Sequence, residues 1–118
     1  MATLANIVVA LIALLHVYIL VLEMFLWDKP AGLRAFGQTQ EAATASRVLA
    51  ANQGLYNGFL AAGLFWGLWL GADGTAVKIF FLGCVLIAGL FGAATASRKI
   101  LFVQAVPAFI GLALVLAA

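Results

Sequence analysis

The sequence predicts an all-α fold: a bundle of four transmembrane helices forming a single domain over residues 1–118. Three observations support this fold class. Hydrophobic residues make up 67% of the chain and charged residues only 8%, whereas soluble domains carry about 25% charged residues. Four apolar stretches are each long enough to cross roughly 30 Å of hydrocarbon as a helix. Most basic residues lie in two of the three joints between these stretches, which predicts a fixed orientation in the membrane.

The first predicted span covers residues 5–27. No basic residue precedes it, and a Trp-Asp-Lys-Pro sequence follows it instead of a cleavage site of small residues. We therefore expect a retained helix rather than a signal peptide. Pro30 and Gly32 are expected to end this helix. A polar connection follows over residues 28–47, and its second half lacks helix breakers, which favours an interfacial helix leading into the second span.

The other predicted spans cover residues 48–70, 76–96 and 100–117. A tight turn over residues 71–74 joins the second span to the third. Basic residues near the spans predict the orientation. The first and third joints hold Lys29, Arg34, Arg47, Arg98 and Lys99, and the second joint holds only Lys78.

This distribution places the loop 28–47 in the cytoplasm and both termini on the extracytoplasmic side. The expected location is the plasma membrane, as a multi-pass protein, which is the inner membrane in a Gram-negative cell. The lipid bilayer is the expected partner. The basic residues form no continuous patch, so binding of nucleic acid is not expected.

Two ionisable side chains of the first span should not face lipid. His16 and Glu23 are seven residues apart and therefore share one face of the helix. At a rise of about 1.5 Å per residue, Glu23 is expected near the cytoplasmic boundary and His16 near the midplane. An ion pair with Arg47 or Arg98 would account for Glu23, and a bond to a partner helix would account for His16. A binding role remains open for both.

The second span carries polar side chains on one arc of about 140°: Asn52, Gln53, Tyr56 and Asn57. Amide groups lose their hydrogen bonds in hydrocarbon, so this arc must face helices, water or a ligand. In the fourth span, Gln104 is expected at a similar depth. It lies beside the carbonyl of Val103, which Pro107 leaves without its helical donor, so an ordinary helix kink is expected there.

Polar groups of three spans are therefore expected to meet in the cytoplasmic half of the bundle. A closed hydrogen-bonded network that fixes helix packing would explain them, and so would a polar pocket that holds a ligand. The two interpretations share residues and differ in whether there is space between the side chains. The candidate ligand-binding residues are His16, Glu23, Asn52, Gln53, Tyr56, Asn57 and Gln104.

Small residues at a spacing of four predict close approach of neighbouring helices. On the second span they form two stripes on opposite sides, so this helix is expected to have close neighbours on two faces. A homo-oligomer formed through these stripes is an open alternative. The candidate packing residues are Gly54, Gly58, Gly63, Gly67, Gly92 and Pro107.

Metal and cofactor sites are not predicted. The chain has one histidine and one cysteine, Cys84, which do not supply the ligands of a metal site. No glycine-rich phosphate loop precedes a helix.

Three runs of residues carry a family resemblance. They are His16-x-Tyr18-Ile19-x-x-Leu22-Glu23-Met24-Phe25-Leu26-Trp27, Asn52-Gln53-Gly54-Leu55-Tyr56-Asn57-Gly58-Phe59-Leu60-Ala61 and Gln104-x-x-Pro107-Ala108. Together they resemble the hallmarks of the domain of unknown function 1304 family, a set of small four-span membrane proteins, over nearly the whole chain. The resemblance implies a four-helix fold in a bacterial plasma membrane. It carries no established activity and supplies no catalytic residue.

A more distant similarity is to the membrane-associated eicosanoid and glutathione metabolism proteins, which are also small four-span bundles. In that family an arginine precedes an asparagine near the start of the second helix, as Arg47 precedes Asn52 here. This chain has Tyr56 near the position where that family carries an acidic residue, which puts a glutathione site in doubt.

The leading functional hypothesis is the binding of a small amphipathic or lipid-derived molecule, with Glu23 and His16 as ionisable elements. A membrane-embedded enzyme is an alternative, with Glu23 or His16 exchanging a proton and Tyr56 donating a hydroxyl group. A proton-coupled exporter that uses Glu23 and a structural subunit of a larger complex are further alternatives. The sequence assigns no ligand and does not choose among these functions.

Overall fold

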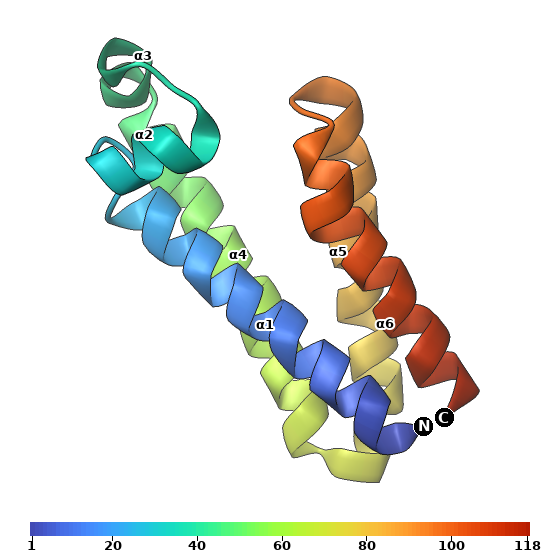
Figure 1. The fold of residues 1–118 in the computed structure, drawn as a ribbon. Coiled ribbons are helices and arrows are strands. Elements are labelled where there is room, and N and C mark those ends of the chain that lie inside the picture. Colours follow the sequence, from blue (N-terminus) through green and yellow to red (C-terminus); the bar gives the residue numbers. More distant parts are fainter. The chain divides into compact units, whose positions relative to one another are not determined.

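The computed structural model describes all 118 residues and is all-α, as predicted (Figure 1). It contains six α-helices, one 3₁₀ helix and one π-helical turn. The α-helices are α1 (Ala2–Met24), α2 (Pro30–Phe36), α3 (Gln40–Ala45), α4 (Arg47–Trp69), α5 (Thr75–Thr95) and α6 (Val106–Ala117). The 3₁₀ helix covers Gly71–Gly74 and the π-helical turn covers Leu101–Ala105.

Two helical segments, Ala2–Met24 and Gly71–Thr95, are long and apolar enough to cross a membrane. The C-terminal apolar segment Leu101–Ala117 is shorter. Helix α4 is as long as α1 but less apolar, because amide side chains interrupt its first half. Helices therefore form in all four apolar stretches, while their crossing of a bilayer remains a prediction.

The contacts within the chain divide it into two compact units. The terminal unit consists of Met1–Leu14 and Leu60–Ala118, and the central unit consists of Leu15–Phe59. Helices α1 and α4 each contribute residues to both units.

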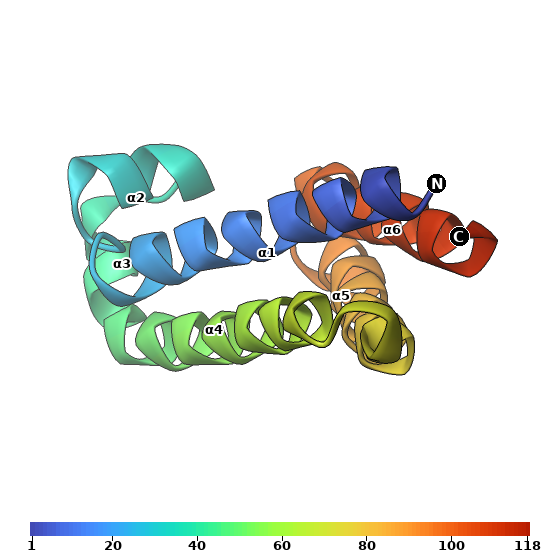
Figure 2. The same cartoon turned by 90° about the horizontal axis from the view of Figure 1, so that it is seen from below.

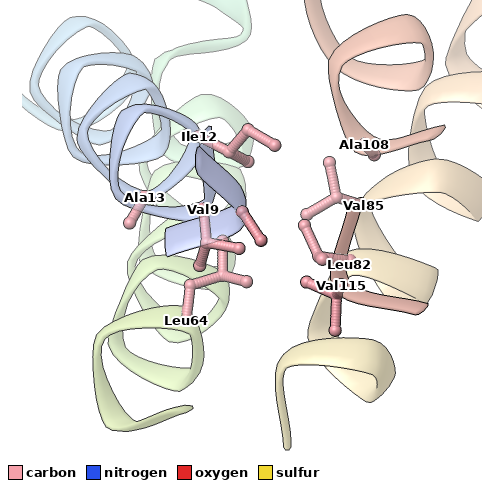
Figure 3. Close-up of a cluster of buried hydrophobic side chains, with 9 residues drawn as sticks. Val9, Ile12, Ala13, Leu64, Leu82, Val85, Ala108 and Val115 are labelled. Carbon is pink, nitrogen blue, oxygen red and sulfur yellow. The ribbon is translucent and has the colours of Figure 1, made fainter. Parts of the chain in front are cut away.

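The terminal unit is built around an apolar core to which α1, α4, α5 and α6 all contribute (Figure 3). Val9, Leu64, Leu82 and Val85 are completely buried in it. Within this unit the core joins the first part of α1 and the last part of α4 to α5 and α6.

Glycines allow the helices of the terminal unit to approach closely. A Cβ atom on Gly89 would lie 2.6 Å from the backbone nitrogen of Ala105, which brings α5 against the π-helical turn. Among the predicted packing glycines, Gly63 faces the ring of Phe81, and Gly92 faces Ile100. These three glycines therefore pack against elements of the same unit.

The π-helical turn lies directly before Pro107. The backbone N–H of Val106 donates to the carbonyl of Leu101, five residues earlier, instead of following the α-helical pattern. Pro107 lies in the first turn of α6 and has no backbone N–H, so it donates no bond back to the preceding turn. Before Pro107 the structure therefore has a wider, π-helical turn, and Gln104 lies within it, while a kink at Pro107 remains a prediction.

In the central unit, the connection between α1 and α4 is folded rather than extended (Figure 2). Pro30, expected only to end the first helix, instead begins α2, because a proline suits the first helical position. Helix α1 has already ended at Met24. A helix also forms in the second half of the connection: α3 begins after Thr39, whose hydroxyl oxygen accepts a hydrogen bond from the Ala42 N–H.

Polar and aromatic contacts hold this connection to the ends of α1 and α4. The Trp27 indole Nε1 donates to Ser46 Oγ at 3.0 Å, and the Trp27 ring packs against the Phe36 ring in a tilted arrangement with centroids 4.8 Å apart. Arg47 forms an ion pair with Asp28 at 3.9 Å. Residues 28–47 therefore form an ordered cap on this end of the central unit.

Candidate functional site

Glu23 on α1 and Asn57 on α4 are joined directly. The Asn57 amide Nδ2 donates to Glu23 Oε1 at 2.6 Å and also to the backbone carbonyl of Gln53 at 3.1 Å. Both amide hydrogens are thereby used, which fixes the orientation of the Asn57 side chain. The structure thus brings together two of the predicted site residues.

Two of the predicted packing glycines set the separation of α1 and α4 at this level. A Cβ atom on Gly54 would lie 2.5 Å from Met24 Cγ, and one on Gly58 would lie 2.7 Å from Leu20 Cδ1. Glycine at these positions lets the backbone of α4 approach α1 closely enough for a short hydrogen bond. The small residues and the polar pair therefore belong to one contact.

The ion pair expected between Glu23 and Arg47 is absent, because Arg47 pairs with Asp28 instead. Glu23 is half-buried and receives its hydrogen bond from a neutral amide. No hydrogen bond reaches its second oxygen, Oε2, and no buried side-chain oxygen in the chain lacks a partner. The Glu23 Oε2 atom is therefore accessible from outside the chain and can accept a hydrogen bond or exchange a proton there.

The rest of the predicted polar arc lies on an exposed face of α4, which we call the polar face: Asn52, Gln53 and Tyr56. The Asn52 Nδ2 donates to the Val48 carbonyl of its own helix at 2.9 Å. The Tyr56 ring is 51% exposed and its only ring contact is with Phe59, at 6.2 Å between centroids. Neither the Gln53 amide nor the Tyr56 hydroxyl is hydrogen-bonded within the chain.

His16 and Gln104 are placed differently. His16 is fully buried in α1 and engaged with other residues. Gln104 is half-buried in the π-helical turn of the terminal unit and is also engaged. Their membership of a common ligand site stays a prediction.

One open cavity of the central unit contains none of the predicted site residues. It has a volume of about 260 Å³ and is lined by Tyr18 of α1 and by Ala31, Arg34 and Ala35 of α2. This cavity was not predicted, because α2 was not expected. No cluster of three or more His, Cys, Asp or Glu side chains that could hold a metal ion occurs in the chain.

Sequence reasoning also missed a buried charge in the terminal unit. Lys78, interpreted as a marker of the second joint, is only 7% exposed, and its Nζ donates to Asn6 Oδ1 at 2.9 Å. A Cβ atom on Gly67 would lie 2.8 Å from Lys78 Cγ, so this predicted packing glycine makes room for the lysine stem. The sequence did contain two signals for this pair: Asn6 lies near the start of the first predicted span, and Lys78 lies near the start of the third.

Comparison with known proteins agrees with the resemblance in the sequence. The model of the family "Protein of unknown function (DUF1304)" matches residues 10–116. The chain is 30% identical over 106 residues to the "Uncharacterized protein YpaA" of Lactococcus lactis subsp. lactis (strain IL1403), covering 88% of this chain and 89% of the relative. No solved structure matches the chain. With nearly its whole length matched, the chain belongs to the DUF1304 family.

Proposed function

We propose that this chain is a multi-pass integral membrane protein that binds a small amphipathic or lipid-derived molecule on the cytoplasmic side of the bilayer. Its four spans are α1, α4, α5 and the C-terminal segment that includes α6. The cap of residues 28–47 lies in the cytoplasm and both termini lie outside. The membrane concerned is the plasma membrane, the inner one in a Gram-negative cell.

The polar face of α4 carries this proposal. In a span, an amide or hydroxyl group without a hydrogen-bond partner is costly, by roughly 1–3 kcal/mol on mutational scales. Gln53 and Tyr56 are exposed, and the side-chain amide of Gln53 and the hydroxyl of Tyr56 have no hydrogen-bond partner within the chain. Their partners must therefore come from outside it, and the polar end of an amphipathic molecule supplies both donors and acceptors.

The surroundings of the polar face suit the apolar part of such a molecule. Leu55, Tyr56 and Phe59 are all exposed on this segment of α4. Their apolar surface would contact a hydrocarbon chain while Gln53 and Asn52 face the polar end. A ligand with a chain and a hydrogen-bonding head group thus matches the face better than a wholly polar solute.

Glu23 supplies an ionisable element beside this face. Asn57 holds one carboxylate oxygen and leaves Oε2 accessible, so the group is oriented without being neutralised by a cation. A ligand carrying a hydroxyl or amino group would donate to this oxygen. His16 remains the deeper ionisable candidate in the same helix.

A structural role is the second candidate, and the Glu23–Asn57 hydrogen bond favours it. A bond of 2.6 Å between neighbouring helices is what a packing network would use. In that case the polar face of α4 would contact a helix of another protein or of a second copy. The two functions differ in whether a small molecule copurifies with the chain.

Mass spectrometry of small molecules released from gently purified protein tests the proposal. The comparison is between wild type, the double variant Gln53→Leu/Tyr56→Phe, and the single variant Gln38→Leu as a control that removes an amide elsewhere in the same unit. We expect a species retained by wild type and by the control, and reduced at least about 10-fold in the double variant, equivalent to about 1.4 kcal/mol. Identical profiles of bulk lipid from all three folded proteins would contradict ligand binding and favour the structural role.

A further inference from the structure

The cavity between α1 and α2 is a second feature of the central unit. Tyr18 precedes the end of α1 at Met24 by six residues, or about 9 Å along the helix axis. Since Tyr18 and α2 line the same cavity, α2 folds back along α1 instead of extending away from it. Arg34 therefore lies beside α1 near Tyr18, before the C-terminal end of that helix.

The position of α2 is fixed by close backbone packing. A Cβ atom on Gly32 would overlap the carbonyl oxygen of Leu26, so only glycine permits this approach. Gly37, with a φ of 61°, ends α2 in the left-handed conformation, which suits glycine. Arg34 therefore projects from a rigid element, although its side chain is exposed.

Arg34 has no anionic partner in the chain. Its guanidinium group makes neither an ion pair nor a hydrogen bond to another residue. The nearby carboxylates are engaged or lie on other elements: Asp28 pairs with Arg47, Glu23 accepts from Asn57, and Glu41 is exposed on α3. The guanidinium group therefore places a positive charge on the wall of the cavity.

We propose that this cavity binds a phosphate ester, supplied by the head group of an acidic phospholipid of the cytoplasmic leaflet. The Arg34 guanidinium would donate two parallel hydrogen bonds to phosphate oxygens, the geometry that distinguishes arginine from lysine. The Tyr18 hydroxyl would donate a further bond, and Ala31 and Ala35 leave the space that larger side chains would fill. Aromatic and basic side chains are also the residues found at head-group level in membrane proteins.

The volume of the cavity decides which part of a lipid it accepts. At about 260 Å³ it is smaller than the roughly 300–1,000 Å³ of pockets that enclose whole ligands. It has room for a phosphate with its glycerol, while the acyl chains stay in the bilayer. This site rests on the membrane placement proposed above but uses other residues than the polar face of α4.

Native mass spectrometry of the full chain from nanodiscs tests the site. The discs contain phosphatidylcholine with phosphatidylglycerol as the acidic lipid, and retained lipids are counted for each variant. Lys29→Gln is the matched control, because Lys29 is an exposed basic residue directly before α2 and its loss changes net charge equally. Arg34→Lys keeps the charge and removes the bidentate geometry.

We expect wild type to retain phosphatidylglycerol over phosphatidylcholine, and Arg34→Gln to lower that retention at least about 10-fold, as loss of a charge-assisted bidentate contact should. Lys29→Gln should change it less than about twofold, with Tyr18→Phe and Arg34→Lys between the two. Equal losses for Arg34→Gln and Lys29→Gln would overturn the site in favour of general surface charge. Unchanged retention in folded Arg34→Gln would overturn it outright.

Glycerol phosphate added to the same discs distinguishes the source of the phosphate. We expect millimolar glycerol phosphate not to displace the lipid, because the free ester lacks the acyl chains that anchor the lipid in the bilayer. Displacement would overturn the lipid assignment and indicate a soluble phosphate ester. Since the double variant Gln53→Leu/Tyr56→Phe leaves this cavity intact, Arg34-dependent retention would survive a failure of the ligand site on α4.

Discussion

The two compact units each hold a charged side chain with an asparagine amide, and they use opposite ends of that amide. In the terminal unit, Asn6 offers its oxygen to the Lys78 ammonium group at 2.9 Å. In the central unit, Asn57 offers its nitrogen to the Glu23 carboxylate at 2.6 Å. Both pairs join segments far apart in the sequence.

The pairs differ in their access to the surroundings. Lys78 is only 7% exposed, its stem packs against Gly67, and its ammonium group is held by Asn6. Glu23 is half-buried and keeps one accessible oxygen. A buried ion held by a neutral group fixes structure, whereas a partly accessible one can also take part in binding. The comparison therefore assigns packing to the first pair and places the candidate chemistry in the central unit.

The largest effect is expected from Asn6→Leu. This change leaves the Lys78 ammonium group without its acceptor, and the loss of a hydrogen bond to a charged group costs about 1.5–3 kcal/mol. Thermal unfolding in detergent, followed by circular dichroism, measures the loss. The double variant Asn6→Leu/Lys78→Met should recover most of it, because no charge is then left unpaired. A single variant as stable as wild type would show that Lys78 reaches water without Asn6.

The second prediction concerns the loss of stability caused by Gly89→Ala, which should be larger than that caused by Gly54→Ala. The new methyl group on Gly89 meets the backbone of Ala105, which cannot move aside, and overpacking of this kind costs about 1–3 kcal/mol. On Gly54 its nearest contact would be a side-chain atom, Met24 Cγ, with the Leu20 carbonyl oxygen farther away at 3.2 Å, so the cost should be smaller and partly offset by the higher helix propensity of alanine, about 0.5–1 kcal/mol. Thermal midpoints of the two variants in the same detergent check this order. The reverse order would mean that α1 and α4 pack more rigidly than α5 and the π-helical turn.

The smallest effect is expected from Asn57→Leu. Glu23 loses its donor but is only half-buried, so water or a lipid head group replaces much of the bond, and we expect a loss of about 1 kcal/mol. Glu23→Gln is the matched control, because its carbonyl oxygen still accepts from Asn57. A loss of stability as large as that of Asn6→Leu would contradict the account, because it would mean that Glu23 has no better access to its surroundings than Lys78.

Much of this arrangement follows from local patterns in the sequence. The apolar stretches predict the four long helical regions because their length and composition are those of helices that need a continuous apolar surface. The polar arc places Asn57 on the side of α4 that also carries the small residues, so a contact with α1 was foreseeable. The rotation of α4 about its axis determines which residue of the arc contacts Glu23. This rotation is set by helix packing and is not evident from the sequence.

The features that escaped prediction depend on tertiary contacts or on a position within an element. Lys78 follows a turn by only four residues, yet α5 begins at Thr75, so the lysine lies one turn inside a helix. Its partner Asn6 is 72 residues away, a pairing that no local pattern reveals. Pro30 was interpreted as a helix breaker, although the same residue favours a helix start. Without α2, the cavity beside Arg34 was not predictable.

The position of each joint relative to the membrane tests the central claim most directly. The single free cysteine is first removed by Cys84→Ala. In this background, one exposed residue of each joint is replaced in turn, by Glu41→Cys, Asp73→Cys or Ser97→Cys. Each variant is treated with a membrane-impermeant thiol reagent, on intact spheroplasts and again after permeabilisation. Four spans with an internal cap predict that only Asp73→Cys is labelled in intact cells. If only α1 and α5 crossed the membrane, Asp73 and Glu41 would lie on the same side. Ser97 would then lie on the opposite side. That result would contradict the four-span arrangement, because α4 and its polar face would then lie outside the bilayer.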